Sequence, residues 1–250
     1  MCGRFVSTTD PAVLGKRIGA VDETGHRVGG PNYNVAPTST IAAVVACRDQ
    51  PDDTRVGETC TRRILPVRWG LVPPWVKADS GGRPLVKSQL INARAETLIS
   101  SPAFRSAGRS QRCLVPMDGY YEWMPNPEPG AKTPYYMCRR DGSPILVAGL
   151  WSAWRPDGAA APLLTATIVT TDAVGELAGI HDRMPLLLDE HEWDRWLDPD
   201  RPAPKELLSG PPDIGGIAMR QVSTLVNNVR NNGPELVEPV GSSNQPIGLF

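Results

Sequence analysis

The feature that most constrains the fold of this chain is a series of runs rich in β-branched and aromatic residues, a composition typical of β-strands. Five such runs span residues 39–49, 61–73, 112–123, 134–154 and 162–171. Asp141-Gly142 divides the fourth run and is typical of a hairpin turn. We therefore expect an α+β fold in which a mostly antiparallel, curved or barrel-like sheet carries short flanking helices.

The expected helices are short, and each has a start or stop signal. Residues 8–20 carry Thr9 or Asp10 as N-cap and Pro11 at the first helical position. Further helices are predicted at 93–99, 171–179, 189–197 and 203–209, the last closed by Gly210. Many of the 26 prolines and 24 glycines lie in connectors that read as surface loops, so we expect one domain over 1–250 and a mobile tail from about 240.

Composition narrows the class of protein. No apolar run approaches the length of a membrane span, and no basic-then-apolar leader precedes the first strand, so we expect a cytoplasmic protein that does not engage membranes. The five cysteines lack the spacing of a disulfide framework or a zinc site, so we expect no metal and no cofactor. No segment suggests an obligate protein partner, and a monomer is expected.

The charge is distributed unevenly along the chain. Residues 1–125 have an excess of five positive charges and residues 126–250 an excess of six negative charges, which permits a polyanionic partner without requiring one.

A cysteine directly follows the initiator methionine in "MCGRF". A small residue at position 2 normally allows methionine removal, which would leave Cys2 with a free α-amine and a thiol on adjacent carbons. The alternative interpretation is a small apolar residue at the start of a first strand.

Three further segments combine polar residues with turn signals. Asn92 in "INARAET" could cap a helix, Glu122 in "DGYYEW" could face solvent on a strand, and His181 in "GIHDRMPLLL" could follow a helix end. Taken singly, each of these residues has an adequate structural explanation.

Taken together, these segments resemble the SRAP family (SOS response-associated peptidases), whose bacterial members shield abasic sites in single-stranded DNA by covalent attachment. The resemblance also includes "YNVAPTS", "RWGLVPPW" and "VNNVRNNGPELVEP", in the order of the family and across nearly the whole chain. It implies that single-stranded DNA containing abasic sites is the partner.

The resemblance implies a mechanism that the chemistry of the residues can support. An abasic sugar opens to an aldehyde, which an amine attacks to give a Schiff base. An α-amine, with a pKa of roughly 7.7 to 8.0, is a better nucleophile near neutrality than lysine at about 10.4. The Cys2 thiol then closes a thiazolidine ring on the same carbon. Family resemblance assigns proton transfers to Glu122 and His181, and orientation of the amine and sugar to Asn92.

The resemblance also implies how the DNA is held. Guanidinium groups suited to phosphate oxygens are those of Arg4, Arg94 and Arg183. Apolar surfaces expected to stack on or wedge beside flanking bases are Trp75 and Pro37. Some family members carry a second tryptophan after the first, where this chain has valine.

Other residues of the matching segments have less specific expectations. Trp69 is expected in the core, and we expect Asn227, Asn228 and Arg230 near the site or the DNA.

Three alternatives stay open. An N-terminal cysteine also opens class II glutamine amidotransferases, although their further motifs are absent here. A thiol peptidase that cleaves its own Met1 would use the same Cys-His-Glu set. A non-covalent DNA-binding module would not need the cysteine.

A lyase activity could accompany the covalent mechanism, because it could follow from the same Schiff base.

Overall fold

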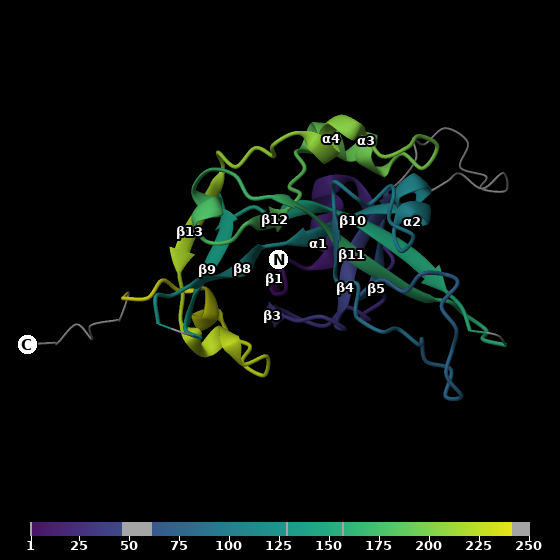
Figure 1. The fold of residues 1–250 in the computed structure, drawn as a ribbon, viewed down its shortest axis with the longest axis horizontal. Coiled ribbons are helices and arrows are strands. Elements are labelled where there is room, and N and C mark those ends of the chain that lie inside the picture. Colours follow the sequence, from purple (N-terminus) through teal and green to yellow (C-terminus); the bar gives the residue numbers. More distant parts are fainter. Residues whose placement is uncertain (1, 47–61, 129, 157, 242–250) are drawn as a thin grey trace, which may run out of the picture.

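The computed structural model describes residues 2–46, 62–128, 130–156 and 158–241, and its strands form two sheets (Figure 1). The first sheet has the order β13-β9-β8-β1-β3. Its strands are β1 (Phe5–Ser7), β3 (Asn32–Val35), β8 (Gly119–Pro125), β9 (Lys132–Arg139) and β13 (Ile217–Gln221). The second sheet has the order β12-β11-β10-β7-β4-β5-β2, with β6 paired to β11. Its strands are β2 (Ala20–Asp22), β4 (Thr40–Ala46), β5 (Arg62–Trp69), β6 (Asn92–Arg94), β7 (Arg112–Met117), β10 (Ile145–Trp154), β11 (Leu163–Asp172) and β12 (Arg183–Pro185).

The second sheet closes on itself. Strand β11 pairs in parallel with β5, with Thr165 opposite Arg68, which completes a ring of β5, β4, β7, β10 and β11. Most other pairings are antiparallel, and the parallel ones join β2 to β5 and β6 to β11. The predicted α+β fold with a barrel-like, mostly antiparallel sheet is therefore confirmed.

The helices are short, and the first begins where the sequence predicts. The Asp10 carboxylate accepts hydrogen bonds from the N–H groups of Ala12 and Val13, and α1 (Pro11–Ile18) ends at Gly19 in the left-handed conformation. The other α-helices are α2 (Arg105–Ser110), α3 (Trp193–Leu197) and α4 (Lys205–Ser209). The described residues also form the 3₁₀ helices η1 (Gly175–Gly179), η2 (Glu190–Glu192), η3 (Thr224–Asn227) and η4 (Pro234–Val237).

The helix predicted at 93–99 is wrong. Residues Asn92–Arg94 form β6 on the edge of β11, and the N–H of Ala95 still donates to the carbonyl of Thr170. The chain then makes isolated turns until Arg105 begins α2. The pairing of residues 92–94 with β11 takes the start of the predicted helix into the sheet, because extended backbone cannot also be helical.

The hairpin predicted at Asp141-Gly142 is also wrong. Strand β9 pairs with β8 and β13, whereas β10 pairs with β7 and β11 in the other sheet. Residues 112–125 and 132–150 form one long antiparallel ribbon, and at its far end the N–H of Asn126 donates to the carbonyl of Ala131. The Asp141-Gly142 turn lies where this ribbon passes from one sheet to the other, opposite Asp118. Asp141-Gly142 is therefore a turn between two strands of different sheets, and not the turn of a hairpin.

This corner also holds the first strand. The Asp118 carboxylate accepts hydrogen bonds from the N–H and hydroxyl groups of both Thr8 and Thr9, just after β1. A Cβ on the adjacent Gly119 would lie 2.4 Å from the Met137 carbonyl oxygen, so only glycine allows β8 to approach β9 this closely.

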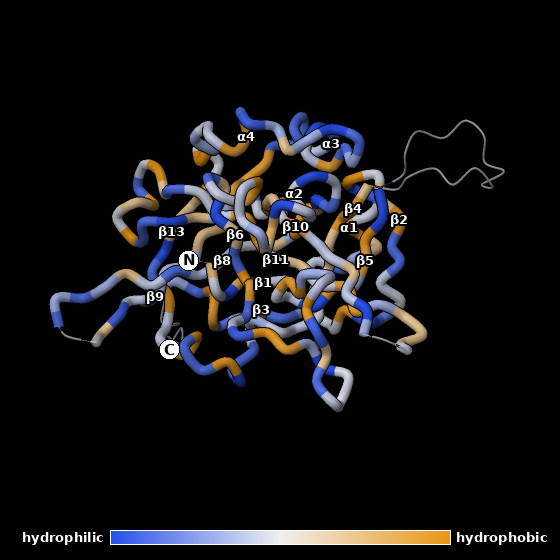
Figure 2. Tube along the Cα trace, turned by 45° about the vertical axis from the view of Figure 1, so that its right-hand side comes forward, coloured by the Kyte–Doolittle hydropathy of each residue, from blue (hydrophilic) through white to orange (hydrophobic). Residues whose placement is uncertain are grey.

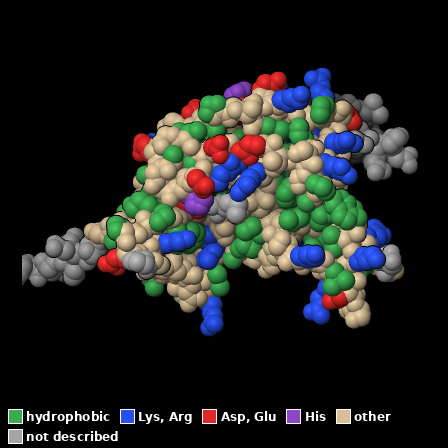
Figure 3. Space-filling model, viewed as in Figure 1, with side chains coloured by type: hydrophobic (Ala, Val, Ile, Leu, Met, Phe, Trp, Pro, Cys, Tyr) green, Lys and Arg blue, Asp and Glu red, His purple; other side chains and the backbone are tan. Residues whose placement is uncertain are grey.

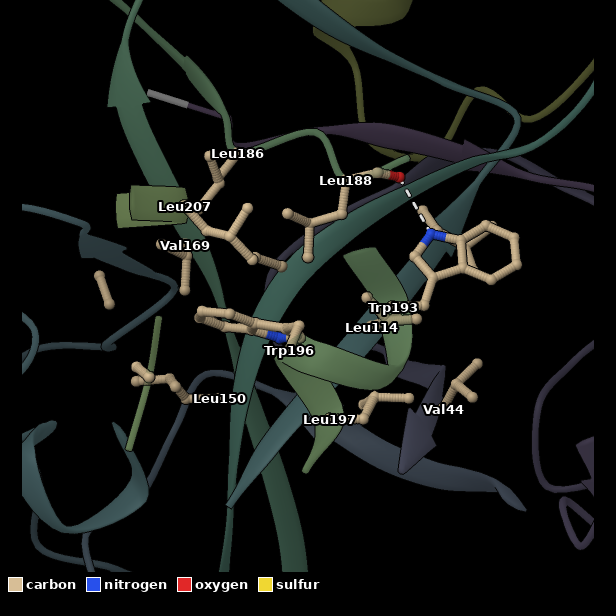
Figure 4. Packing of buried hydrophobic residues seen from close by; sticks show 14 of the residues in the cluster. Val44, Leu114, Leu150, Val169, Leu186, Leu188, Trp193, Trp196, Leu197 and Leu207 are labelled. Carbon is tan, nitrogen blue, oxygen red and sulfur yellow. Dashed lines mark hydrogen bonds between the residues drawn. The ribbon is translucent and has the colours of Figure 1, made fainter. Parts of the chain in front are cut away.

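Buried side chains fill both sides of the closed sheet. Along β4, Ala42 and Val44 belong to one cluster, while Ala43 and Val45 belong to the other. The first cluster is covered by the helices, and Trp196 of α3 lies against strand side chains there (Figure 4). The hydropathy colouring shows the same pattern, with apolar strands inside and hydrophilic outlying loops (Figure 2). In the described residues, no helix has the length and apolar character needed to cross a membrane.

Candidate active site

Cys2 is buried at the start of the chain, just before β1. Its side chain has no exposed surface and belongs to the same buried cluster as Phe5 and Trp69. Burial raises the pKa of the Cys2 thiol, and the nearby charge of Glu122 raises it further, while a hydrogen bond from the backbone of Arg4 acts in the opposite direction. The thiol is therefore protonated at neutral pH, unless a neighbouring group stabilises the thiolate or accepts the thiol proton.

Asn92 holds the backbone of Cys2. Its amide nitrogen donates to the Cys2 carbonyl oxygen at 2.8 Å, from the first residue of β6. The Asn92 Oδ1 atom is buried and has no hydrogen-bond partner in the described part of the chain. A buried acceptor of this kind is ready to bind a donor on an amine or a sugar.

Glu122 lies on β8 with 3% of its surface exposed. Burial raises the pKa of its carboxyl to about 7, and the charge of Asp182 acts in the same direction. A carboxyl group with this pKa is populated in both protonation states near neutrality, so it can accept a proton and return it.

His181 follows η1 and stands half-exposed before β12. Its Nδ1 lies 2.9 Å from the N–H of Arg183 and 2.7 Å from an Asp182 carboxylate oxygen. Nδ1 thus faces both a donor, the backbone N–H of Arg183, and an acceptor, the Asp182 carboxylate. Burial lowers the pKa of His181, which favours the neutral ring over the imidazolium at pH 7.

These four side chains come from segments far apart in the sequence. Cys2 contacts Asn92 directly and interacts electrostatically with Glu122. The charge of Lys132, on β9, acts on both Glu122 and His181. Figure 3 shows acidic and basic side chains beside a histidine at the middle of this face, near the amino terminus marked in Figure 1. The structure thus brings the predicted catalytic residues into one neighbourhood.

The predicted phosphate-binding arginines differ in their surroundings. Arg183 is buried, and its guanidinium donates to the carboxylates of Glu96 and Asp172 at 2.7 and 2.5 Å. It also donates to the carbonyl of Thr170 at 2.7 Å. Arg94, at the end of β6, is exposed. A phosphate could approach Arg94 freely but would compete with two carboxylates for Arg183.

Arg4 joins the site to the C-terminal segment. Its guanidinium donates to Asn34 Oδ1 at 2.6 Å and to the Val226 carbonyl at 2.9 Å, and lies over the Trp123 ring. The Asn34 amide nitrogen donates to the carbonyls of Val226, Asn228 and Asn231.

The C-terminal segment also reaches β8 directly. Asn227 Oδ1 accepts from Trp123 Nε1 at 2.7 Å, one residue beyond Glu122, while Arg230 is exposed. The segment 226–231 is therefore anchored beside the site by Trp123 and by Asn34. Asn34 was not singled out from the sequence.

The two predicted apolar wedges lie on the surface. Trp75 is 57% exposed, an unusual state for so large an apolar side chain, and Pro37 is partly exposed. Trp69 is fully buried and donates to the Ile91 carbonyl, so its expected core position is confirmed.

Sequence reasoning also missed Tyr120. Alternation along β8 puts this residue on the face of Glu122, and that pattern was readable in "GYYEW". Its side chain is fully buried in the cluster that contains Cys2.

Two other features do not add to the site. Within the described ranges, no three His, Cys, Asp or Glu side chains gather closely enough to hold a metal ion. A groove of about 770 Å³ runs between the start of β9 and the C-terminal segment, and its charged lining residues, Glu235, Glu238 and Lys132, are negative on balance, which disfavours an anionic strand. Cys47 and Cys60 lie outside the described residues, as does most of the predicted tail.

Comparison with known proteins identifies relatives over nearly the full length. The chain is 37% identical over 243 residues to "Abasic site processing protein YoqW" of Bacillus subtilis, covering 95% of this chain and 99% of that protein. It is 30% identical over 269 residues to "Abasic site processing protein HMCES" of Gallus gallus, covering 96% of this chain and 78% of that protein.

Solved structures agree on the fold. A protein from Bacteroides thetaiotaomicron superposes with a TM-score of 0.76 at 23% identity, covering 95% of this chain and 99% of the other. The family model "SOS response associated peptidase (SRAP)" matches residues 1–229. The chain therefore belongs to the SRAP family.

Proposed function

We propose that this protein processes abasic sites in single-stranded DNA by covalent attachment through Cys2 after removal of Met1. Two relatives that match almost the whole chain are named abasic site processing proteins. The observation that carries the proposal is the hydrogen bond from Asn92 to the Cys2 carbonyl, which fixes residue 2 beside Glu122. A terminal residue held this way can present its amine and thiol to one carbon.

The chemistry proceeds in two bond-forming steps. The α-amine attacks the C1′ aldehyde of the opened sugar, and the carbinolamine loses water to give an imine. The Cys2 sulfur then adds to the imine carbon, and the thiol proton is transferred to the imine nitrogen to give a neutral thiazolidine. Glu122, with a pKa of about 7, can accept the thiol proton and deliver it to nitrogen. His181, whose lowered pKa favours the neutral ring, can donate a ring N–H toward the sugar ring oxygen to favour opening.

The DNA is held through its backbone in this proposal, because an abasic site offers no base to read. The exposed Arg94 is positioned for a phosphate oxygen. The exposed Trp75 offers a stacking surface for a neighbouring base. Affinity should therefore fall with salt and depend little on sequence.

A cross-linking assay tests the proposal. Protein whose Met1 removal has been verified by intact mass is incubated with a single-stranded oligonucleotide that carries one abasic site. A heat-stable adduct is expected, and Cys2→Ala should abolish it, while Cys138→Ala, at a half-buried cysteine, should not. An adduct of unchanged yield in the Cys2→Ala protein would exclude thiazolidine attachment.

The same site supports two further activities as part of this proposal. Elimination from the imine would cleave the strand, which would be a lyase reaction. Removal of Met1 by the Cys2, Glu122 and His181 groups would expose the amine and would agree with the word peptidase in the family description. Denaturing gels that separate cleaved from cross-linked strands test the first. Intact masses of wild-type and Glu122→Gln protein made without aminopeptidase test the second, since a self-processing site predicts Met1 retained in the variant.

A further inference from the structure

Two adjacent tyrosines of β8 are both buried but differ in hydrogen bonding. The Tyr121 hydroxyl donates to the Tyr33 carbonyl at 2.8 Å. The Tyr120 hydroxyl is buried and has no hydrogen-bond partner among the described residues. An unpaired hydroxyl in the core is costly, so a partner that forms only during the reaction is a physical reason to keep it.

The backbone register places Tyr120 beside the reacting residue. Tyr120 pairs with Phe5, three residues after Cys2, and its side chain packs in the same buried cluster as Cys2. Because side chains alternate along a strand, Tyr120 and Glu122 share a face, while Tyr121 points to the other side. Tyr121 accordingly belongs to a different cluster, with Val222 and Val226.

Electrostatics keep the Tyr120 hydroxyl in its donor form. Burial raises the pKa of Tyr120, and the negative charges of Cys2 and Glu122 each raise it further. These interactions also show that a thiolate at Cys2 lies close enough for its charge to act on Tyr120. At any pH used for the reaction, Tyr120 therefore offers an O–H group.

We propose that Tyr120 is a further catalytic residue, whose hydroxyl donates a hydrogen bond to the Cys2 sulfur while that sulfur adds to the imine carbon. This inference rests on the function proposed above. In the ring-closing step the S–H proton passes to Glu122 and then to the imine nitrogen, the C–S bond forms, and Tyr120 keeps its proton throughout. Together with the Arg4 backbone N–H, Tyr120 offsets the burial that disfavours a thiolate at Cys2.

The test separates imine formation from ring closure. Tyr120→Phe and wild-type proteins, both with Met1 removed, are mixed with the abasic oligonucleotide, and samples are reduced with borohydride or heated at successive times. Borohydride traps the imine, and heat-stable adduct reports the closed ring. In Tyr120→Phe the imine should form at the wild-type rate, while ring closure should slow by about tenfold at pH 7. The alkaline rise of the closure rate should move up by about one pH unit.

Tyr121→Phe is the matched control, because it also removes one buried tyrosine hydroxyl from β8. It should lower the urea midpoint through loss of its bond to Tyr33 and leave the ratio of imine to adduct unchanged. Equal closure rates and pH profiles in Tyr120→Phe and wild type would overturn the assignment of Tyr120. Failure of wild-type protein to form a Cys2-dependent adduct would instead overturn the proposed function.

Discussion

Burial changes the acid–base behaviour of two residues in the site, with different consequences. For Cys2, burial raises the thiol pKa, so the nucleophilic thiolate is scarce and depends on the groups around the sulfur. For Glu122, burial raises the pKa to about 7, so the carboxyl group can exchange protons near neutrality. Burial thus disfavours ionisation of the Cys2 thiol, and it also raises the pKa of Glu122 into the range where this carboxylate can accept the thiol proton.

Glu122 should make the protein less stable as the pH rises. Its pKa is about 7 in the folded state and 4.5 ordinarily, so the folded state binds this proton more tightly. The associated stability is complete below pH 4.5 and is lost as the pH rises through 7. Glu122→Gln removes this loss, and the free energy of unfolding at pH 8 should exceed that of wild type by up to ~3 kcal/mol.

Urea denaturation of the two proteins at pH 4 and pH 8 measures this difference. The curves should nearly coincide at pH 4 and separate at pH 8, while cross-linking by the variant is impaired. A wild-type advantage at pH 8 would show that the Glu122 charge stabilises the fold.

At the scale of elements, capping residues and strand composition were reliable guides. Asp10 and Pro11 begin α1 as expected, because an N-cap acts on its own first turn. Asp141-Gly142 misled because a turn signal does not state which strands pair across it. The helix expected at 93–99 lost to tertiary pairing of β6 with β11, which no local pattern reports.

Arg112 is a buried link between elements that sequence patterns did not reveal. From β7, its guanidinium donates to five backbone carbonyls around the ends of α2 and α3, those of Gly108, Arg109, Trp196, Asp198 and Arg201. Carbonyl oxygens at helix ends have no partner within the helix, and a planar guanidinium can serve several at once. Arg112 therefore ties two of the covering helices to β7, in addition to the apolar packing of Trp196.

Arg112→Lys should lower the free energy of unfolding by about 2–4 kcal/mol, because an ammonium has three donors and lacks the planar fork. Urea denaturation followed by tryptophan fluorescence measures the effect, since Trp196 lies against this arginine. Arg109→Lys, at an exposed residue three positions earlier, is the control and should change stability by less than about 0.5 kcal/mol. Similar values for both variants would show that the carbonyl contacts contribute little.

At the scale of the whole molecule, the site forms only when the two sheets meet. Cys2 precedes a strand of the first sheet, Glu122 lies on another strand of that sheet, and Asn92 belongs to the second. The matching segments of the sequence pointed to these residues through family resemblance, but no spacing along the chain relates them. The C-terminal segment, tied down by Asn34, was expected only loosely near the site.

Of the three arginines that the sequence grouped as phosphate ligands, Arg94 and Arg183 should behave differently in a salt titration. Arg94→Ala removes an exposed guanidinium, so the slope of log Kd against log salt for single-stranded DNA should fall by about 0.7, with stability unchanged. Arg183→Ala removes, from the first residue of β12, the partner of Glu96 and Asp172, so it should lower the free energy of unfolding by about 1–3 kcal/mol and leave that slope nearly unchanged. Fluorescence anisotropy from 50 to 300 mM salt, with urea denaturation of the same samples, measures both quantities. If Arg183→Ala lowered the slope as much as Arg94→Ala did, Arg183 would have to exchange its carboxylates for a phosphate when DNA binds.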